Sequence, residues 1–177
     1  MSLPPLKMKT IYGIEGPWPG RLAIVARPRG GEWLEDDVLR WRQKGIDVVV
    51  SLLTRQENQE LGLTEEATTI TEQGLLFISF PIVDRGVPSR RWDLQALVGR
   101  LASLLTQGKN VAIHCRQGVG RSALLAAALL VEAGFGVEQA FRQIELSRGC
   151  PVPETSEQKQ WVEQLVALEP APALLDG

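Results

Sequence analysis

The sequence predicts an α/β fold with a mainly parallel central sheet flanked by helices. Short apolar runs rich in β-branched residues alternate with segments whose apolar residues have helical spacing. Strands that alternate with helices favour a parallel sheet with crossover connections. The chain has 177 residues, of which 44% are hydrophobic and 23% charged, as in an ordinary globular domain. We therefore expect one domain over residues 1–168, followed by a frayed C-terminal tail over residues 169–177.

The first part of the chain predicts three strands and a helix. Apolar stretches at residues 11–14 and 22–25 are separated by a loop rich in glycine and proline, which indicates a hairpin-like pair. Residues 33–44 have apolar side chains at helical spacing, and Gly45 follows where a helix C-terminus is expected. Residues 47–53 are rich in β-branched side chains and predict a buried strand.

The rest of the chain continues this alternation. Thr64 opens a helix that ends near Gly74, and the apolar run at residues 75–83 predicts the next strand. Helical spacing returns at residues 92–106, and a further strand is expected at residues 109–113. Because such folds bind ligands beyond the carboxyl ends of their strands, the residues after these last two strands are candidates for a site. Three more helices are expected over residues 121–133, 137–148 and 156–168.

The composition excludes several classes of protein. The formal net charge of −2 does not suggest a nucleic-acid-binding protein. Two cysteines and one histidine are too few for a disulfide framework or a zinc site, so no metal and no other cofactor is expected. The longest apolar run, residues 123–131, is far shorter than the about 20 residues that cross a bilayer, and the N-terminus has no apolar core of signal-peptide length. We expect a cytoplasmic protein that binds neither nucleic acid nor membranes.

Arginines are nevertheless concentrated near the segments that could form an anion site. A locally basic cleft in an acidic protein suits an anionic substrate, although most of these side chains could simply form a solvated face. The arginines in question are Arg85, Arg90, Arg91, Arg116, Arg121 and Arg148.

The most informative segment covers residues 114–122 (HCRQGVGRS) and joins a predicted strand to a predicted helix. A glycine-containing loop in this position turns backbone N–H groups inward, and the helix N-terminus adds positive potential, so we expect an anion to bind there. Gly118 and Gly120 allow the tight backbone that such a loop requires. The loop begins with the thiol of Cys115 and ends with the guanidinium of Arg121, whose planar fork can bind two phosphate oxygens.

The surroundings of Cys115 favour a thiolate, because a helix N-terminus and a nearby cation both stabilise ionised sulfur. A thiolate can attack phosphorus without a separate base. A cysteine protease would need a histidine base, but the only histidine, His114, is the neighbouring residue and is expected to point to the opposite face of the strand. We expect His114 to hydrogen-bond the loop backbone and hold its shape. The hydroxyl of Ser122 is either a donor to the sulfur as it leaves or an ordinary helix-start hydroxyl.

The order His-Cys, five residues, Arg-Ser resembles the signature of the cysteine-based protein tyrosine phosphatase superfamily. The short chain resembles the dual-specificity branch, and its pattern is most similar to compact enzymes of the cyclin-dependent-kinase-associated type. Residues 80–88 (FPIVDRGVP) look like the loop that carries the family's general acid, and residues 152–162 look like the segment that carries a glutamine near the site. The resemblance covers residues 45–165 in element order, while the first 44 residues contribute only a plausible fold match.

The resemblance implies a mechanism and a role for each matching residue. Cys115 attacks phosphorus to form a phosphocysteine, and Asp84 protonates the leaving oxygen before it takes a proton from the attacking water. Gln158 is a candidate for positioning that water, although a surface glutamine in a helix is nearly as good an interpretation. Asp84 could likewise be only a turn-forming residue. The residues expected to hold the phosphoryl group are Arg116, Gln117, Gly118, Val119, Gly120 and Arg121.

We therefore expect a metal-independent phosphomonoester hydrolase that acts on phosphotyrosine and on phosphoserine or phosphothreonine in proteins or peptides, and that binds phosphate or sulfate in its site. Gln117 and Val119 stand where a lipid-phosphate enzyme often has lysine, which argues mildly against a phosphoinositide phosphatase; an RNA 5′-phosphate phosphatase also stays open. A phosphate-binding module without turnover would be expected to lose Cys115. An arsenate reductase or sulfur-transfer protein would need more redox cysteines than Cys150 supplies.

Overall fold

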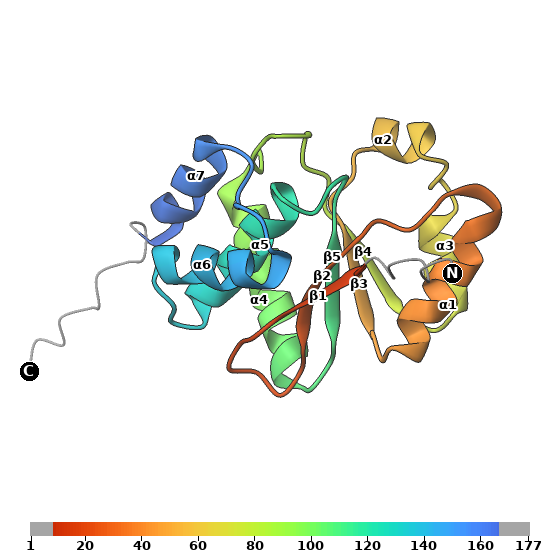
Figure 1. Ribbon diagram of the computed structural model, residues 1–177, viewed down its shortest axis with the longest axis horizontal. Coiled ribbons are helices and arrows are strands. Elements are labelled where there is room, and N and C mark those ends of the chain that lie inside the picture. Colours follow the sequence, from red (N-terminus) through yellow and green to blue (C-terminus); the bar gives the residue numbers. More distant parts are fainter. Residues whose placement is uncertain (1–8, 167–177) are drawn as a thin grey trace, which may run out of the picture.

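Within residues 9–166, which the computed structural model describes, a five-stranded sheet crosses the centre of the molecule and confirms the predicted α/β fold (Figure 1). The strand order is β1-β2-β5-β3-β4; β1 is antiparallel to β2, and the other neighbours are parallel. The strands are β1 (Ile11–Ile14), β2 (Leu22–Val25), β3 (Val48–Ser51), β4 (Leu76–Ser79) and β5 (Val111–His114). The predicted tail over residues 169–177 lies outside the described residues, and the single domain over residues 1–168 stays a prediction.

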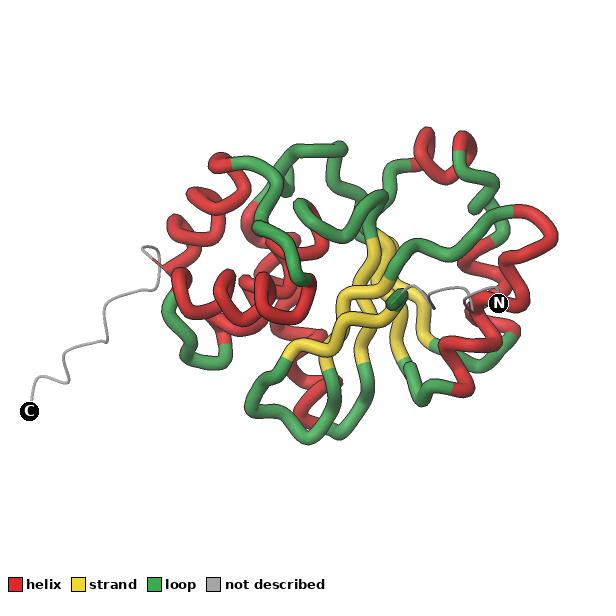
Figure 2. The backbone as a smooth tube through the Cα atoms, in the orientation of Figure 1, coloured by secondary structure: helices red, strands yellow, loops and turns green. Residues whose placement is uncertain are grey.

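The register of the parallel strands brings three strand ends to the same edge of the sheet. Ser51 of β3 lies opposite Ser79 of β4 on one side and opposite His114 of β5 on the other. Figure 2 shows loops, in green, gathered beyond this end of the strands. The loop after β5 begins with Cys115, and the segment after β4 carries Asp84, so the sheet itself brings both predicted reactive side chains to the edge where such folds bind ligands.

Helices cover both faces of the sheet. In Figure 1, α4 to α7 lie on one side of the sheet and α1 and α3 lie on the other. No helix in the part of the chain that the structure describes is long and apolar enough to span a membrane. The helical elements are a 3-10 turn η1 (Gly31–Trp33), α1 (Leu34–Gln43), α2 (Arg55–Glu60), α3 (Glu66–Glu72), α4 (Arg91–Thr106), α5 (Arg121–Glu132), α6 (Val137–Arg148) and α7 (Ser156–Val166).

The alternation of side chains along the strands divides the core into two apolar clusters, one on each face of the sheet. Val48 and Val50 of β3 belong to the cluster that includes α4, α5, α6 and α7, whereas Val49 belongs to the cluster that includes α1 and α3. Helix α5 is covered on all sides, since every residue from Arg121 to Leu130 is buried. Each fully buried leucine side chain of this helix contributes about 1.5–3 kcal/mol. The start of α5, where the loop after β5 ends, is therefore held by packing from every direction.

Two strands end earlier than the sequence indicates. The strands expected over residues 47–53 and 75–83 end at Ser51 and Ser79. In the second of these segments Phe80 N still donates to Ser51 O at 2.9 Å, but Ile82 N donates to Leu52 O at 3.1 Å, one residue short of the regular parallel register, and the chain leaves the sheet there. The shorter strand frees the following residues to form the loop that carries the carboxylate.

Helix α2 is not among the helices predicted from the sequence. Its six residues have no apolar stripe, but a capping box marks its start. The Thr54 hydroxyl accepts a hydrogen bond from Glu57 N at 3.3 Å, and Glu57 Oε2 accepts one from Thr54 N at 2.9 Å. This cap turns the chain just beyond β3 and directs the Glu57 carboxylate toward the same sheet edge as Cys115.

Candidate active site

The segment from Cys115 to Arg121, which we call the phosphate loop, joins β5 to α5. The Cys115 side chain is 3% exposed, and its Sγ accepts a hydrogen bond from Gly118 N at 3.2 Å. This bond requires a tight turn of the chain, and Gly118 makes that turn with φ at +73°, in the left-handed region that glycine adopts without strain. Gly118 thus has the tight backbone expected of it, and its N–H points at the sulfur, while its role in phosphate binding stays a prediction.

The carbonyls of the phosphate loop point away from the sulfur and toward Arg148. Arg148 Nε donates to Gly118 O at 2.9 Å, and Arg148 Nη2 donates to Gln117 O at 3.2 Å. In a trans peptide the C=O and the following N–H point in opposite directions. The N–H groups of Gly118 and Val119 are therefore directed to the Cys115 side of the loop, as an anion-binding loop requires.

Two side chains approach the phosphate loop closely at Gly120. A Cβ atom at this position would lie 2.8 Å from Glu154 Oε2 and 3.0 Å from Gln158 Nε2. Gln158 is fully buried, so the interpretation of this residue as a surface glutamine is wrong. Its Nε2 donates to Gly86 O at 3.1 Å. The Gln158 amide thus contacts both the phosphate loop and the loop that carries Asp84.

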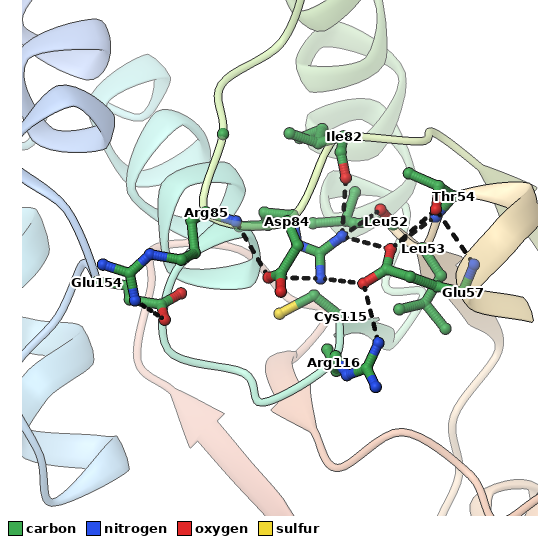
Figure 3. A network of polar contacts seen from close by, with 12 residues as sticks. Leu52, Leu53, Thr54, Glu57, Ile82, Asp84, Arg85, Cys115, Arg116 and Glu154 are labelled. Carbon is green, nitrogen blue, oxygen red and sulfur yellow. Dashed lines mark hydrogen bonds and ion pairs between the residues drawn. The ribbon is translucent and has the colours of Figure 1, made fainter. Parts of the chain in front are cut away.

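Arg121 is buried, and its guanidinium binds segments from three parts of the chain. Figure 3 shows this network of polar contacts, with its partners Leu52, Glu57, Ile82 and Asp84 labelled. Its Nη1 and Nη2 each lie 2.8 Å from one carboxylate oxygen of Glu57, a two-pronged ion pair with α2. Nη1 also donates to Ile82 O at 2.7 Å and to Leu52 O at 3.4 Å. A fifth hydrogen bond runs from Nη2 to Asp84. All five bonds are donated by the two terminal nitrogens, so among the described contacts the Nε–H group stays available for another partner.

The charges around Arg121 stabilise one another. Burial lowers the pKa of Arg121, but the hydrogen bonds to Glu57 and the negative charges of Cys115, Glu57 and Asp84 more than offset it, so the pKa is raised. Burial likewise raises the pKa of Glu57, but hydrogen bonds from Arg121 and Thr54 outweigh that effect and lower it. Both groups are therefore ionised at neutral pH, and the guanidinium is a fixed positive charge beside the thiol.

Asp84 lies on a strained turn next to the guanidinium. Its Oδ1 accepts hydrogen bonds from Arg121 Nη2 at 3.1 Å and from Arg85 N at 3.0 Å, while the side chain stays 51% exposed. Arg85 has φ at +59°, which is uncommon for a residue other than glycine, and its Nη1 lies 2.9 Å from Glu154 Oε1. The carboxylate predicted as the general acid is thus at the phosphate loop and open to solvent.

His114 and Cys115 point to opposite faces of the sheet, as predicted. His114 is fully buried in the layer of α1 and α3, near the Trp41 ring, and its Nε2 pairs with Glu66 of α3 at 2.5 Å. The expectation that His114 hydrogen-bonds the loop backbone is wrong, because the side chain leaves on the face away from the loop and meets a carboxylate there. His114 therefore supports the strand from behind and cannot act as a base for the sulfur.

The other predicted site residues lie at the phosphate loop in different ways. Ser122 Oγ is buried and has no hydrogen-bond partner in residues 9–166, so a bond to the Cys115 sulfur is not formed here. The Arg116 side chain is 38% exposed, with Nη1 3.4 Å from Glu60 Oε2. Gln117 is exposed and Val119 packs partly against the core, so both contribute backbone groups to the loop.

Taken as chemistry, the site combines a buried thiol, inward N–H groups, a fixed guanidinium and a half-exposed carboxylate. Such a set can bind an oxyanion, attack its central atom and transfer a proton to a leaving group. No cluster of three or more metal-ligating side chains occurs among the described residues.

Known proteins share both the sequence pattern and the fold. A family described as "Polymorphic toxin system, DSP-PTPase phosphatase" matches residues 24–135, more than half of the chain. The chain belongs to this phosphatase family. The match includes β3, β4, the phosphate loop and α5, and it confirms the resemblance drawn from residues 114–122.

Relatives of this phosphatase are found among curated proteins and solved structures. Cyclin-dependent kinase inhibitor 3 of Rattus norvegicus is 26% identical over 135 residues, which are 74% of this chain and 62% of that protein. Protein tyrosine phosphatase domain-containing protein 1 of Bos taurus is 32% identical over 136 residues, which are 71% of this chain and 17% of that protein. The chain thus spans between 17% and 62% of the length of these relatives.

Two solved structures superpose on most of the phosphatase. The kinase associated phosphatase (KAP), with serine in place of its catalytic-site cysteine, has a TM-score of 0.82 at 20% identity and covers 93% of this chain and 99% of its own. Tk-PTP in its active form has a TM-score of 0.73 at 25% identity and covers 90% of this chain and 98% of its own. From the sequence alone, the first 44 residues had only a plausible match to the phosphatase fold. Because these superpositions cover at least 90% of the chain, they include most of those residues.

Sequence reasoning missed the residues that hold the site together from outside its motif. Glu57, Glu66 and Glu154 are acidic partners of site residues, and none belongs to the motif. Of these only Glu57 had a local signal, since its capping box with Thr54 places a turn just after a strand.

Proposed function

We propose that this protein is a metal-independent phosphomonoester hydrolase that uses Cys115 as its nucleophile and acts on phosphotyrosine and on phosphoserine or phosphothreonine in proteins. The observation that carries this proposal is the environment of the thiol. It is buried, accepts a hydrogen bond from Gly118 N at 3.2 Å and has the cationic Arg121 beside it. A thiolate stabilised by N–H groups and a guanidinium is suited to displacement at phosphorus.

In the first step, Cys115 Sγ attacks phosphorus, so that an S–P bond forms while the P–O bond to the leaving group breaks. The N–H groups of the phosphate loop and the Arg121 guanidinium bind the three remaining phosphoryl oxygens. An incoming phosphoryl oxygen competes with Asp84 for Arg121 Nη2, where the carboxylate accepts a hydrogen bond at 3.1 Å. Once it is displaced from this donor, the Asp84 carboxylate takes up a proton from solvent, and it then gives that proton to the leaving oxygen as the P–O bond breaks.

In the second step, a water molecule attacks the phosphocysteine. The O–P bond forms as the S–P bond breaks, the water proton passes to Asp84, and inorganic phosphate and the Cys115 thiolate are restored. Gln158 supports this step, because its buried amide contacts the phosphate loop at Gly120 and the Asp84 loop at Gly86 O. An amide in that place can hold a water between the two loops.

The charges at the rim favour a substrate with a single phosphate. Arg85 is paired with Glu154 at 2.9 Å, and Arg116 lies 3.4 Å from Glu60, so these exposed cations are already matched by carboxylates. A lipid headgroup with several phosphates would need unmatched cations at the rim. PTPMT1, solved in complex with PI(5)P, shares the fold at a TM-score of 0.66 and 21% identity, and a phosphoinositide therefore belongs among the test substrates.

The test is turnover of p-nitrophenyl phosphate and of phosphotyrosine, phosphoserine and phosphothreonine peptides in the presence of EDTA, with Cys115→Ser as the matched variant. We expect activity that the chelator leaves unchanged, and a C115S protein that binds phosphate esters without turnover. Activity that is lost with EDTA and restored by a metal, or that persists in C115S, would contradict the mechanism. Faster turnover of phosphoinositides or 5′-phosphorylated RNA than of every phosphopeptide would overturn the substrate assignment.

A further inference from the structure

Arg148 contacts the phosphate loop although it lies outside the loop and outside the predicted mechanism. It is the last residue of α6, and it donates to two consecutive carbonyls, Gly118 O at 2.9 Å and Gln117 O at 3.2 Å. Hydrogen bonds from a guanidinium are charge-assisted and stronger than those between neutral groups. Two neighbouring peptide units of the phosphate loop are therefore oriented by one side chain.

The guanidinium of Arg148 is itself held in place by strand β1. Its central carbon lies 4.0 Å from the centroid of the Tyr12 ring, the geometry of a cation–π contact. The neighbouring Ser147 Oγ donates to Gly13 O at 2.5 Å, which ties the end of α6 to the same strand. The Arg148 guanidinium thus contacts an aromatic ring and two loop carbonyls at the same time.

Both peptide units that Arg148 holds adjoin a glycine. Gly118, with φ at +73°, has no Cβ to restrict its backbone. A rotation of the 117–118 peptide unit would turn its carbonyl oxygen toward the bound anion and its N–H away from the Cys115 sulfur. Arg148 opposes this rotation, because the rotated unit would give up its charge-assisted bond.

We infer that Arg148 is a positioning residue for oxyanion binding, acting with Tyr12 to keep the Gly118 and Val119 N–H groups directed into the phosphate loop. Its consequence for turnover rests on the proposed function, whereas its consequence for anion binding does not. Loss of the side chain should weaken the binding of inorganic phosphate and lower kcat/KM by about 10- to 100-fold, the range seen when an outer partner that orients a ligand is removed.

The experiment compares Arg148→Met, Arg148→Lys, Tyr12→Leu and Tyr12→Phe with Arg142→Met, a control on an exposed arginine of the same helix. Inorganic phosphate is titrated into each ¹⁵N-labelled protein, and the amide resonances of Gly118 and Val119 report the affinity. Thermal unfolding and kcat/KM for p-nitrophenyl phosphate are measured in parallel. We expect R148M to lose the most affinity, R148K to recover part of it, and Y12L to lose more than Y12F, while R142M stays within about twofold of wild type.

Wild-type phosphate affinity in a folded R148M protein, or an equal loss in R142M, would overturn the inference. If R148M does not fold, R148K and Y12L decide the question by the same criterion. The two proposals fail separately. If phosphate binding depends on Arg148 but the wild type does not hydrolyse phosphate esters, the proposed function is refuted and this inference stands. If the wild type hydrolyses them and neither binding nor hydrolysis depends on Arg148, this inference is refuted and the proposed function stands.

Discussion

Arg121 is the last residue of the phosphate loop, whereas Arg148 contacts that loop from helix α6, and the two arginines have different partners and surroundings. Arg121 is buried, bound to the Glu57 carboxylate through both terminal nitrogens, and close to the Cys115 charge. Arg148 is only partly buried, and its polar partners in the loop are two backbone carbonyls. The comparison indicates two different roles. Arg121 supplies positive charge to the bound anion, and Arg148 sets the direction of the backbone N–H groups.

Replacement of Arg121 should have the largest combined effect, because it lowers both activity and stability. In Arg121→Met the anion loses its guanidinium, and we expect kcat/KM to fall by at least about 100-fold. The variant also removes the two-pronged partner of the buried Glu57 and leaves Arg116 Nη1, 4.0 Å from Glu57 Oε1, as its remaining cation, which should cost up to about 3–5 kcal/mol of unfolding free energy. Arg121→Lys separates the two effects, because it keeps a positive charge for Glu57 but loses the planar fork. Equal activity of R121K and wild type would argue against a two-pronged contact with the phosphate.

Asp84 accepts a hydrogen bond from the Arg121 nitrogen that the substrate's phosphoryl group is proposed to bind. In Asp84→Asn the proton donor is lost while the shape is kept, and turnover of substrates with poor leaving groups should fall by about 10²–10⁴-fold. Activated aryl phosphates need little protonation of the leaving oxygen, so their turnover should fall much less. Steady-state kinetics over a series of leaving groups measures the difference, and an equal loss across the series would refute the role as general acid.

The Glu57–Arg121 pair predicts a pH-dependent contribution to stability. Because the pKa of Glu57 is lowered in the folded protein, its stabilisation is fully present above the ordinary glutamate pKa and is lost as the pH falls through the lowered value. We therefore expect Glu57→Gln to be less stable than wild type at pH 7, with a difference that shrinks toward pH 3. Urea unfolding at a series of pH values gives this difference, and a gap that widens on acidification would contradict the assignment.

The exposed pair of Arg85 and Glu154 should have the smallest effect. Its side chains are 63% and 25% exposed, and exposed ion pairs contribute at most about 1 kcal/mol. Arg85→Met should therefore lower kcat/KM by less than about tenfold, with a loss that disappears in high salt as screening removes the wild-type advantage. Arg29→Met, which breaks a surface ion pair with Asp37 away from the loop, is the matched control. A salt-independent loss in R85M would show that Arg85 acts on the Asp84 loop by some other contact.

Local patterns were sufficient to predict the fold class and the centre of the site. The strand expected at residues 47–53 and the helix expected at residues 92–106 could be predicted because each depends on the pattern of apolar residues within its own segment. Cys115 and Arg121 were found because loop, thiol and guanidinium are contiguous in the chain.

The partners of these residues could not be predicted in the same way. Arg121 meets Glu57, and His114 meets Glu66, only because the sheet brings distant segments together. The side chain of Arg148 likewise reaches the loop from the far end of another helix, and an arginine there has no local feature that distinguishes it from a solvated one. Sequence periodicity describes faces of helices and strands, whereas these contacts depend on how the faces are assembled.

The most direct test of the mechanism is to trap the covalent intermediate. Wild-type protein is mixed with a phosphotyrosine peptide, quenched with acid during turnover and digested, and the peptide that contains Cys115 is examined by mass spectrometry. We predict that this peptide carries one phosphoryl group on the sulfur, and that Asp84→Asn changes its amount while Cys115→Ser abolishes it. Turnover with no phosphorylated Cys115 at any quench time, or with the phosphoryl group on another residue, would contradict nucleophilic attack by this thiol.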